Sequence, residues 1–303
     1  MTTRAQVAML NRTTRPAAEL QVVAVIVVYE QALDEVESWP VLRSWLEGSK
    51  TADGSLVGIV VYDNSARPRA SASGEFEGCT YAHDGNNGGT AAAYACAAKV
   101  AGKSGAEWLL LLDQDTKVTD AFLSCMFAEL RACRGDLPGA LVARVLHGKV
   151  LVSPAVVGRG GAIRPLAGKA RDLGQGYLTA IASGSVLNVE AFQSLLPFPS
   201  GLWLDYVDHW ILRRMQTCGF RVVVVDCELQ HDLSIVNPAG ISRRRLASIL
   251  DGEREFHRLL GVQARAAYPF RILGRIMRYL VTQPQLAAYT VAWAFGSKRP
   301  SGA

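Results

Sequence analysis

Residues 108–115 read Trp-Leu-Leu-Leu-Leu-Asp-Gln-Asp, and this stretch decides the fold. Four consecutive leucines after a tryptophan are typical of a strand buried on both faces, as the central strands of α/β sheets are. The apolar run ends where two aspartates begin. Asp113 and Asp115 therefore stand at the carboxyl end of the predicted strand, which is where open α/β sheets bind ligands.

Asp113 and Asp115 have a spacing that suits a divalent cation. Two carboxylates separated by one residue can approach one ion, directly or through water, and oxygen atoms are the ligands that Mg²⁺ and Mn²⁺ prefer. An ion held in this way commonly bridges the phosphates of a nucleotide. A strand end followed by a plain acidic turn is the alternative interpretation, and these two residues alone leave both open.

Strands alternate with helices over the first half of the chain, which predicts βαβ units and a mainly parallel sheet. Strands are expected at residues 21–29, 56–62 and 79–83, and helices at 31–47 and 90–101. Further on, we expect short strands within 140–169, a strand over 177–188 interrupted at Ser183-Gly184, a helix that starts near 203–210, a strand at 221–225, and His231 in a polar loop.

Polar residues follow two more of these strands. Tyr29 and Asp63 each stand at a strand end, and in a doubly wound sheet such ends share one edge with Asp113. The Asp63 carboxylate can accept a hydrogen bond from a pyrimidine base, against which Tyr29 can lie. An Asx turn that closes the strand is the simpler interpretation of Asp63.

The turn Asn86-Asn87-Gly88-Gly89 precedes a predicted helix. Glycines allow a close approach of the backbone, and a helix N-terminus favours anions, so Asn86 and Gly88 are candidates for phosphate binding. An ordinary N-cap or turn explains the same residues. The turn is not GxGxxG, which argues against a dinucleotide fold of the dehydrogenase kind.

Asp205 and Asp208 lie three residues apart at the start of a predicted helix, so both can face one side. Either is a candidate general base, although acids in a first helical turn also suit the helix dipole. Trp203 lies beside them in the sequence. His231 can ligate a cation through a ring nitrogen, and a histidine without special function is the alternative.

The composition limits the class of protein. Half of the 303 residues are hydrophobic, which excludes global disorder. The six cysteines form no CxxC pair or Cys/His cluster, so we expect neither zinc nor disulfides, and a reducing cytosol. Residues 1–20 are expected to be a disordered lead-in without a signal-peptide core.

The basic charge is concentrated at the C-terminal end. Residues 240–303 contain eleven Lys or Arg against three acids, a net +8, so the rest of the chain carries −3. The basic segment contains the apolar residues Phe270, Leu273, Met277 and Leu280 at helical spacing. We therefore expect basic amphipathic helices over 241–303 that lie on an anionic membrane surface or pack on the body or another subunit. No nucleic-acid partner is expected.

Taken in order, these motifs resemble a family-two inverting glycosyltransferase of the GT-A fold, over roughly residues 22–233. The matching stretches are VIVVY (25–29), VVYDN (60–64), NNGG (86–89), LLLLDQD (109–115), ASG (182–184), LDYVDHW (204–210) and LQHD (229–232). The DQD and DYVD forms are similar to the rhamnosyltransferase-like branch, which builds bacterial cell-surface polysaccharides from dTDP-rhamnose. The NNGGT stretch is similar to galactofuranosyl-type members that use a UDP-sugar.

The resemblance implies a GT-A catalytic domain over 21–240 and a role for each matching residue. Tyr29, Asp63, Asn86, Gly88 and Asp113 would bind the nucleotide-sugar. The cation, Mg²⁺ or Mn²⁺, would be held by Asp115 and His231 with Asp113. The base would be Asp208, with Asp205 as second choice, and Ser183, Gly184 and Trp203 would lie on the acceptor side. The acceptor would be a saccharide or a lipid-linked saccharide at the cytoplasmic face of the cell membrane.

The chain departs from the family at three points. His209-Trp210 stand where many relatives carry an acid, the spacing from Asp208 to Arg213 differs by one residue, and Tyr94 replaces a common asparagine. Lys117 argues against a haloacid dehalogenase phosphatase, which has Thr or Val there, and the first strand end lacks the basic glycine-rich loop of a pyrophosphorylase. A non-catalytic carbohydrate-binding or scaffold protein with a decayed site is the alternative from another class.

Overall fold

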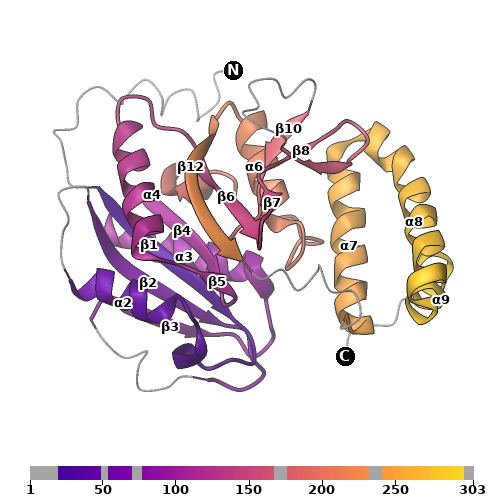
Figure 1. The fold of residues 1–303 in the computed structure, drawn as a ribbon, viewed down its shortest axis with the longest axis horizontal. Helices are drawn as coiled ribbons and strands as arrows, with labels where there is room; N and C mark the ends of the chain where they lie inside the picture. The colour runs from indigo at the N-terminus through magenta and orange to yellow at the C-terminus, as the bar shows by residue number, and fades with distance from the viewer. Residues whose placement is uncertain (1–19, 49–53, 70–76, 167–175, 232–240, 297–303) are drawn as a thin grey trace.

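A mixed sheet with helices on both faces forms the body of the protein, and three C-terminal helices stand beside it (Figure 1). The computed structural model describes residues 20–48, 54–69, 77–166, 176–231 and 241–296. Of the predicted lead-in, only Leu20 lies within these ranges. The predicted fold class, an α/β protein with a mainly parallel sheet, flanking helices and a helical C-terminal extension, is confirmed.

Parallel strands form one half of the large sheet. In spatial order they are β3 (Cys79–His83), β2 (Ser55–Asp63), β1 (Gln21–Val28) and β4 (Trp108–Asp113). Val27 pairs with Asp113, and Val28 pairs with Asp63. The carboxyl ends of β2, β1 and β4 therefore meet at one edge of the sheet, as the sequence predicts.

The other half of the sheet is mixed. Beyond β4 follow β11 (Ser185–Asn188), β6 (Ala140–His147), β12 (Val222–His231) and β5 (Thr116–Lys117), and β7 (Val150–Ser153) pairs with β6. β11 runs antiparallel to both neighbours, whereas β12 is parallel to β6. The antiparallel pairing of β5 with β12 places His231 opposite Thr116.

Helices cover both faces because the strands are apolar on both. Alternate residues of β1 point to opposite sides, with Val23 in one core cluster and Val22 in the other. One face packs against α3 (Gly89–Ser104), α5 (Val189–Gln193) and α6 (Val207–Thr217). The other packs against α2 (Trp39–Glu47), which follows the short η1 (Leu33–Glu35), and α4 (Asp120–Ala132).

The predicted interruption at Ser183-Gly184 is confirmed, since a turn at Gly184 (φ +80°) separates β10 (Tyr177–Thr179) from β11. Two other expectations for this region are wrong, namely that 177–188 belongs to one strand and that His231 lies in a loop. β10 instead joins β8 (Ala155–Val157) and β9 (Ile163–Pro165) in a small antiparallel sheet. His231 lies at the end of β12, not in a loop, since β12 continues past Val225.

The C-terminal helices α7 (Arg243–Leu260), α8 (Val262–Thr282) and α9 (Pro284–Phe295) share an apolar core of their own. α7 also docks on the sheet body, where Phe256 enters the main core. The contact is close, since a Cβ at Gly252 would lie 2.9 Å from the carbonyl oxygen of Asp205. No helix among the described ranges has both the length and the apolar character needed to cross a bilayer.

A disulfide joins Cys125 of α4 to Cys227 of β12, with 5.8 Å between the Cα atoms. The expectation that no cysteines pair is therefore wrong. The two residues are 102 positions apart and meet only through the packing of α4 on the sheet, so no local spacing indicates the pair. Disulfides are uncommon in a reducing cytosol, so this pair counts against the redox compartment that we expected from the cysteine pattern.

Candidate functional site

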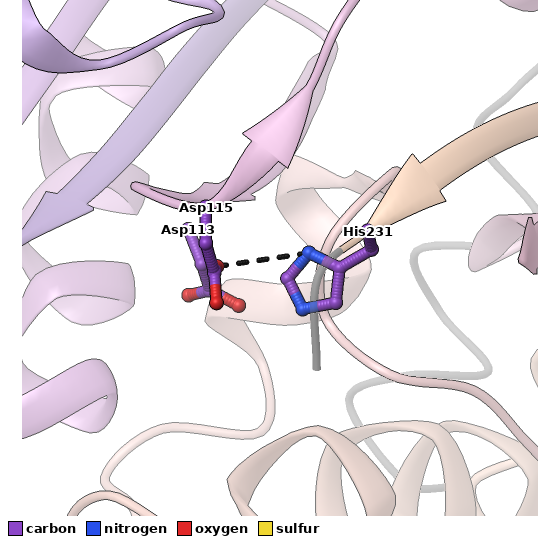
Figure 2. Close-up of side chains that lie close together, drawn as sticks. All are labelled: Asp113, Asp115 and His231. Atoms are coloured by element: carbon purple, nitrogen blue, oxygen red, sulfur yellow. Dashed lines mark ion pairs between the residues drawn. The ribbon is translucent and has the colours of Figure 1, made fainter. Parts of the chain in front are cut away.

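Asp113, Asp115 and His231 lie together at the carboxyl edge of the sheet (Figure 2). Asp113 ends β4, Asp115 occupies the turn between β4 and β5, and His231 ends β12. One ligand atom from each lies within 4.8 Å of those from the other two, and His231 Nδ1 is 3.6 Å from Asp115 Oδ1. The short strand β5 causes this convergence, because its pairing with β12 carries His231 to the carboxylates.

Neighbouring hydroxyls hold the cluster in place. Ser183 donates a hydrogen bond of 2.7 Å to Asp113 Oδ2. Thr116 Oγ1 accepts one of 3.2 Å from the backbone N–H of Asp113 and lies 3.5 Å from His231 Nδ1. Burial raises the pKa of the Asp113 carboxyl to about 6, the Ser183 hydrogen bond opposes the rise, and the negative charge of Asp115 adds to it.

The donor set fits a divalent cation. Ligand atoms on one octahedral ion lie about 3 to 4.2 Å apart, because each stands about 2.1 Å from the ion. The observed separations need only small side-chain movements to reach this range. Two carboxylates and one imidazole suit Mg²⁺ or Mn²⁺, and a cation would offset the mutual repulsion of Asp113 and Asp115.

A cavity of about 1000 Å³ opens in front of this cluster. Strand ends, the start of α6 and the helices α7 and α8 line it. Tyr29 and Trp203 expose aromatic rings at its wall, with relative exposures of 46% and 36%. Gln114 fixes the backbone beside Tyr29, because its Oε1 accepts a hydrogen bond of 2.6 Å from the Tyr29 N–H.

Asp208 and Asp205 have different surroundings. Asp208, in the first turn of α6, lines the cavity and accepts hydrogen bonds from the backbone N–H groups of Ala182 and His209. Asp205 also borders the cavity, but its side chain is 8% exposed and forms an ion pair with Arg245 and a 2.7 Å hydrogen bond from Ser248. The pairing with α7 leaves Asp208 as the more available base.

Asp63 does not line the cavity. It is fully buried, and its Oδ1 accepts a hydrogen bond from the Ser65 N–H while Oδ2 accepts from Arg69 N–H and the Tyr81 hydroxyl. The first of these is the Asx turn that the sequence also allows. These hydrogen bonds hold the pKa of the Asp63 carboxyl below its usual value, although burial acts in the opposite direction.

Backbone N–H groups of the glycine turn before α3 are already hydrogen-bonded to side chains of the protein. Asp84 accepts the N–H groups of Asn86 and Gly88, and Asn64 Oδ1 accepts that of Gly89. Gly89 (φ +71°) is required here, since a Cβ would lie 2.3 Å from the Trp203 carbonyl oxygen. These contacts match the plain turn that the sequence left open, and they leave Asn86 and Gly88 outside the cavity wall.

Ser183 and Gly184, which the sequence assigns to the acceptor side, lie behind the cavity wall. Ser183 is buried and directed at Asp113, and Gly184 is packed against Leu229. Trp203 does line the cavity, together with Ile181 and Ala182. In this structure Ser183 therefore positions the Asp113 carboxylate.

The sequence analysis did not identify several residues of the cavity wall as site residues. Tyr94 of α3 borders the cavity and is 1% exposed, yet its hydroxyl has no hydrogen-bond partner among the described residues. Burial and the charges of Asp113 and Asp208 raise the pKa of this phenol well above its usual value. His209 also lines the cavity, with Nδ1 2.7 Å from Thr179 Oγ1.

No family model and no curated protein sequence matches the chain. Among solved structures, it is similar to S. aureus TarS, with a TM-score of 0.47, 11% identity and coverage of 92% of this chain and 46% of that one. TarS 1–349 in complex with UDP gives 0.47 and 12%, with coverage of 92% and 76%.

Glucosyl-3-phosphoglycerate synthase from Mycobacterium tuberculosis, in complex with Mn²⁺, UDP and phosphoglyceric acid, gives a TM-score of 0.46 and 17% identity. The match covers 78% of this chain and 79% of the synthase. This chain spans less than half the length of the first TarS structure.

Proposed function

We propose that the chain is a glycosyltransferase of the GT-A type that uses a nucleotide-sugar donor and a divalent cation. The observation that carries the proposal is the convergence of Asp113, Asp115 and His231 at the strand ends, in the same cavity as Asp208. A cation-binding edge and a nearby carboxylate base are the two groups that sugar transfer from a nucleoside diphosphate requires.

The donor would bind with its diphosphate at the metal cluster. A bound Mg²⁺ or Mn²⁺ would act as a Lewis acid on the leaving diphosphate. Asp115 and His231 would hold the ion with Asp113, which Ser183 orients. The exposed ring of Tyr29, fixed by Gln114, would lie against the base.

Asp208 would act as the general base. It takes the proton from an acceptor hydroxyl, whose oxygen attacks the anomeric carbon while the bond from that carbon to the diphosphate oxygen breaks. The electron pair of the broken bond leaves with the nucleoside diphosphate. One displacement through an oxocarbenium-like transition state inverts the anomeric configuration, as in the inverting glycosidases.

The proposed donor is dTDP-L-rhamnose, and the acceptor is a saccharide or lipid-linked saccharide of a bacterial cell-surface polysaccharide. A UDP-sugar, as in galactofuranosyl transfer, is the alternative donor. Thymine and uracil differ by one methyl group, worth only about 1 kcal/mol, so binding of the base alone discriminates weakly between the two donors. The exposed apolar side chains of α8, such as Phe270 and Met277, would keep the enzyme at the membrane surface.

Asp208→Asn tests the catalytic assignment. Donor turnover should fall by about two to four orders of magnitude, because the amide cannot take the proton. We would measure release of nucleoside diphosphate from dTDP-rhamnose and a panel of UDP-sugars, with water as the acceptor, and the anomeric configuration of the product by NMR.

Asp226→Asn is the matched control, since Asp226 is an exposed acid outside the cavity wall. It should leave turnover unchanged. Near-normal turnover in the Asp208→Asn protein would remove Asp208 from the role of base, and a retained configuration would remove the single-displacement mechanism.

A further inference from the structure

The two walls of the cavity carry opposite charge. The sheet-edge wall holds Asp113 and Asp115 beside the end of β4 and Asp208 at the start of α6. The opposing helices α7 and α8 contribute four arginines to the same cavity: Arg244, Arg245, Arg275 and Arg278. The acidic wall suits a cation. The arginines of the other wall suit a ligand of the opposite charge, an anion.

Two of the four arginines are neutralised within the protein. Arg245 pairs with Asp205, and Arg275 Nη1 lies 2.7 Å from Glu253 Oε2. Glu253 is 1% exposed and also pairs with Arg271 at 3.2 Å, so one buried carboxylate faces two guanidinium groups. These pairs leave the wall with an excess of positive charge.

Arg244 and Arg278 meet no carboxylate among the residues that the structure describes. Arg244 is exposed in the first turn of α7, and Arg278 lies with its guanidinium 5.5 Å from the ring centre of Tyr279. Both border the cavity. Because no carboxylate of the described residues balances either guanidinium group, an anion bound in the cavity at this wall would be favourable.

A phosphate is the anion that best fits such a pair. The guanidinium group presents a planar set of donors that matches phosphate oxygens, and charge-assisted hydrogen bonds of this kind are the strong ones. A neutral saccharide needs no uncompensated positive charge. In the proposed function, a cation held by Asp113, Asp115 and His231 would serve the diphosphate of the donor, so a second anion would belong to the other substrate.

We propose that the acceptor carries a phosphate group and that Arg244 and Arg278 bind it. This inference rests on the proposed function, because it names the acceptor class of the same site. The phosphate can belong to a lipid carrier at a membrane surface or to a soluble sugar phosphate. The binding chemistry is the same for both sources.

The experiment is a calorimetric titration of the full-length protein with inorganic phosphate in the presence of saturating Mg²⁺ and UDP or dTDP. The double variant Arg244→Gln, Arg278→Gln is compared with Arg243→Gln, Arg265→Gln. The control pair lies on the same two helices, is exposed, and does not border the cavity.

Phosphate affinity should fall about tenfold or more in the first double variant and stay unchanged in the control, because hydrogen bonds to charged groups are lost only in the first. Nucleotide affinity should be unchanged in both. Equal phosphate affinity in the two double variants would overturn the proposal. A parallel loss of nucleotide affinity would also overturn it, since the arginines would then hold the donor.

Two further competition measurements distinguish a lipid phosphate from a soluble sugar phosphate. If vesicles that contain phosphatidic acid displace the phosphate, the lipid source is supported, and if only a soluble hexose 1-phosphate does so, the free source is supported. Absence of metal-dependent nucleotide binding in the unmodified protein would be seen before phosphate is added. That result would contradict the proposed function and is distinguishable from failure of the phosphate site.

Discussion

At the scale of single residues, Tyr94 is buried near Asp113 and Asp208, and its hydroxyl finds no hydrogen-bond partner in the described part of the chain. A buried hydroxyl without a hydrogen-bond partner costs about 1 to 3 kcal/mol of stability. We therefore expect a bound ligand to supply the partner of the Tyr94 hydroxyl. Because the Tyr94 hydroxyl is shielded from solvent, a substrate hydroxyl in the cavity would do so after a small movement of the wall. Tyr94 is therefore expected to contribute to donor or acceptor binding.

Tyr94→Phe should leave the melting temperature unchanged or higher and lower kcat/KM by about tenfold, the worth of one hydrogen bond made in the complex. Tyr268→Phe is the control. Its hydroxyl donates a 3.1 Å hydrogen bond to the Leu250 carbonyl, so this variant should lose stability and keep its kinetics. Unchanged kinetics in Tyr94→Phe would assign the tyrosine to packing alone.

The carboxylates of the site could be predicted, but their partners could not. Asp113 and Asp115 follow an unmistakable buried strand, so their position at the sheet edge follows from the local sequence. The contribution of Ser183 to Asp113 depends on a contact between residues 70 positions apart. Arg244 and Arg278 escaped notice because a basic helix gives no local sign of the cavity that it borders.

At the scale of elements, strand length was the main source of error. The stretch after Val225 alternates between exposed and buried residues, with Asp226, Glu228 and Gln230 outside and Cys227 and Leu229 inside. That period of two marks a half-buried strand, but the polar residues suggest a loop when the apolar run before them is taken as the whole strand. For this reason the sequence analysis assigned His231 to a loop, although it ends β12.

Helix α7 contains a titratable group that links stability to pH. His257 is buried, its Nδ1 donates to the Glu253 carbonyl oxygen, and its Nε2 has no partner among the described residues. Burial lowers the pKa of His257 from its ordinary 6.5, and the charges of Arg271 and Arg275 act in the same direction, while Glu253 opposes them.

The free energy of unfolding should therefore fall as the pH drops below 6.5. Between that value and the lower folded pKa, the unfolded chain binds a proton that the folded chain does not, and above 6.5 the contribution is fully present. Thermal unfolding across this range should show a smaller fall in His257→Phe and an unchanged fall in His147→Gln. An identical pH dependence in all three proteins would contradict the assignment.

At the scale of the whole molecule, α8 has one buried and one exposed apolar face. Tyr268, Ile272 and Ile276 face the helical core, whereas the outward face exposes Phe270, Leu273, Met277, Leu280 and Val281. Phe270 is 76% and Val281 86% exposed. An amphipathic helix with basic residues on its flank binds anionic membrane surfaces.

Full-length protein should float with anionic vesicles, and Phe270→Glu, Met277→Glu should abolish flotation without lowering the melting temperature, because both side chains are exposed. Val150→Glu, at an exposed site on β7, is the control and should still float. Sedimentation of the unmodified protein away from the vesicles would contradict membrane binding by this face.

The organisation of the body could be predicted because apolar runs and strand–helix alternation specify a parallel sheet locally. The position of the C-terminal helices beside the cavity could not be predicted, because it depends on how Gly252 and Phe256 of α7 pack against the sheet body. That docking adds a basic wall to the acidic sheet edge, and the cavity lies between them. The boundary near residue 240 stays a prediction.

The most direct measurement is the affinity of the full-length protein for UDP and dTDP by calorimetry, with and without Mn²⁺, in the unmodified chain and in Asp115→Ala. One of the two nucleotides should bind at least about tenfold more tightly with Mn²⁺, and Asp115→Ala should lose this difference. Binding that is absent, or that is the same with and without Mn²⁺, would contradict a metal-dependent nucleotide-sugar site at Asp113, Asp115 and His231.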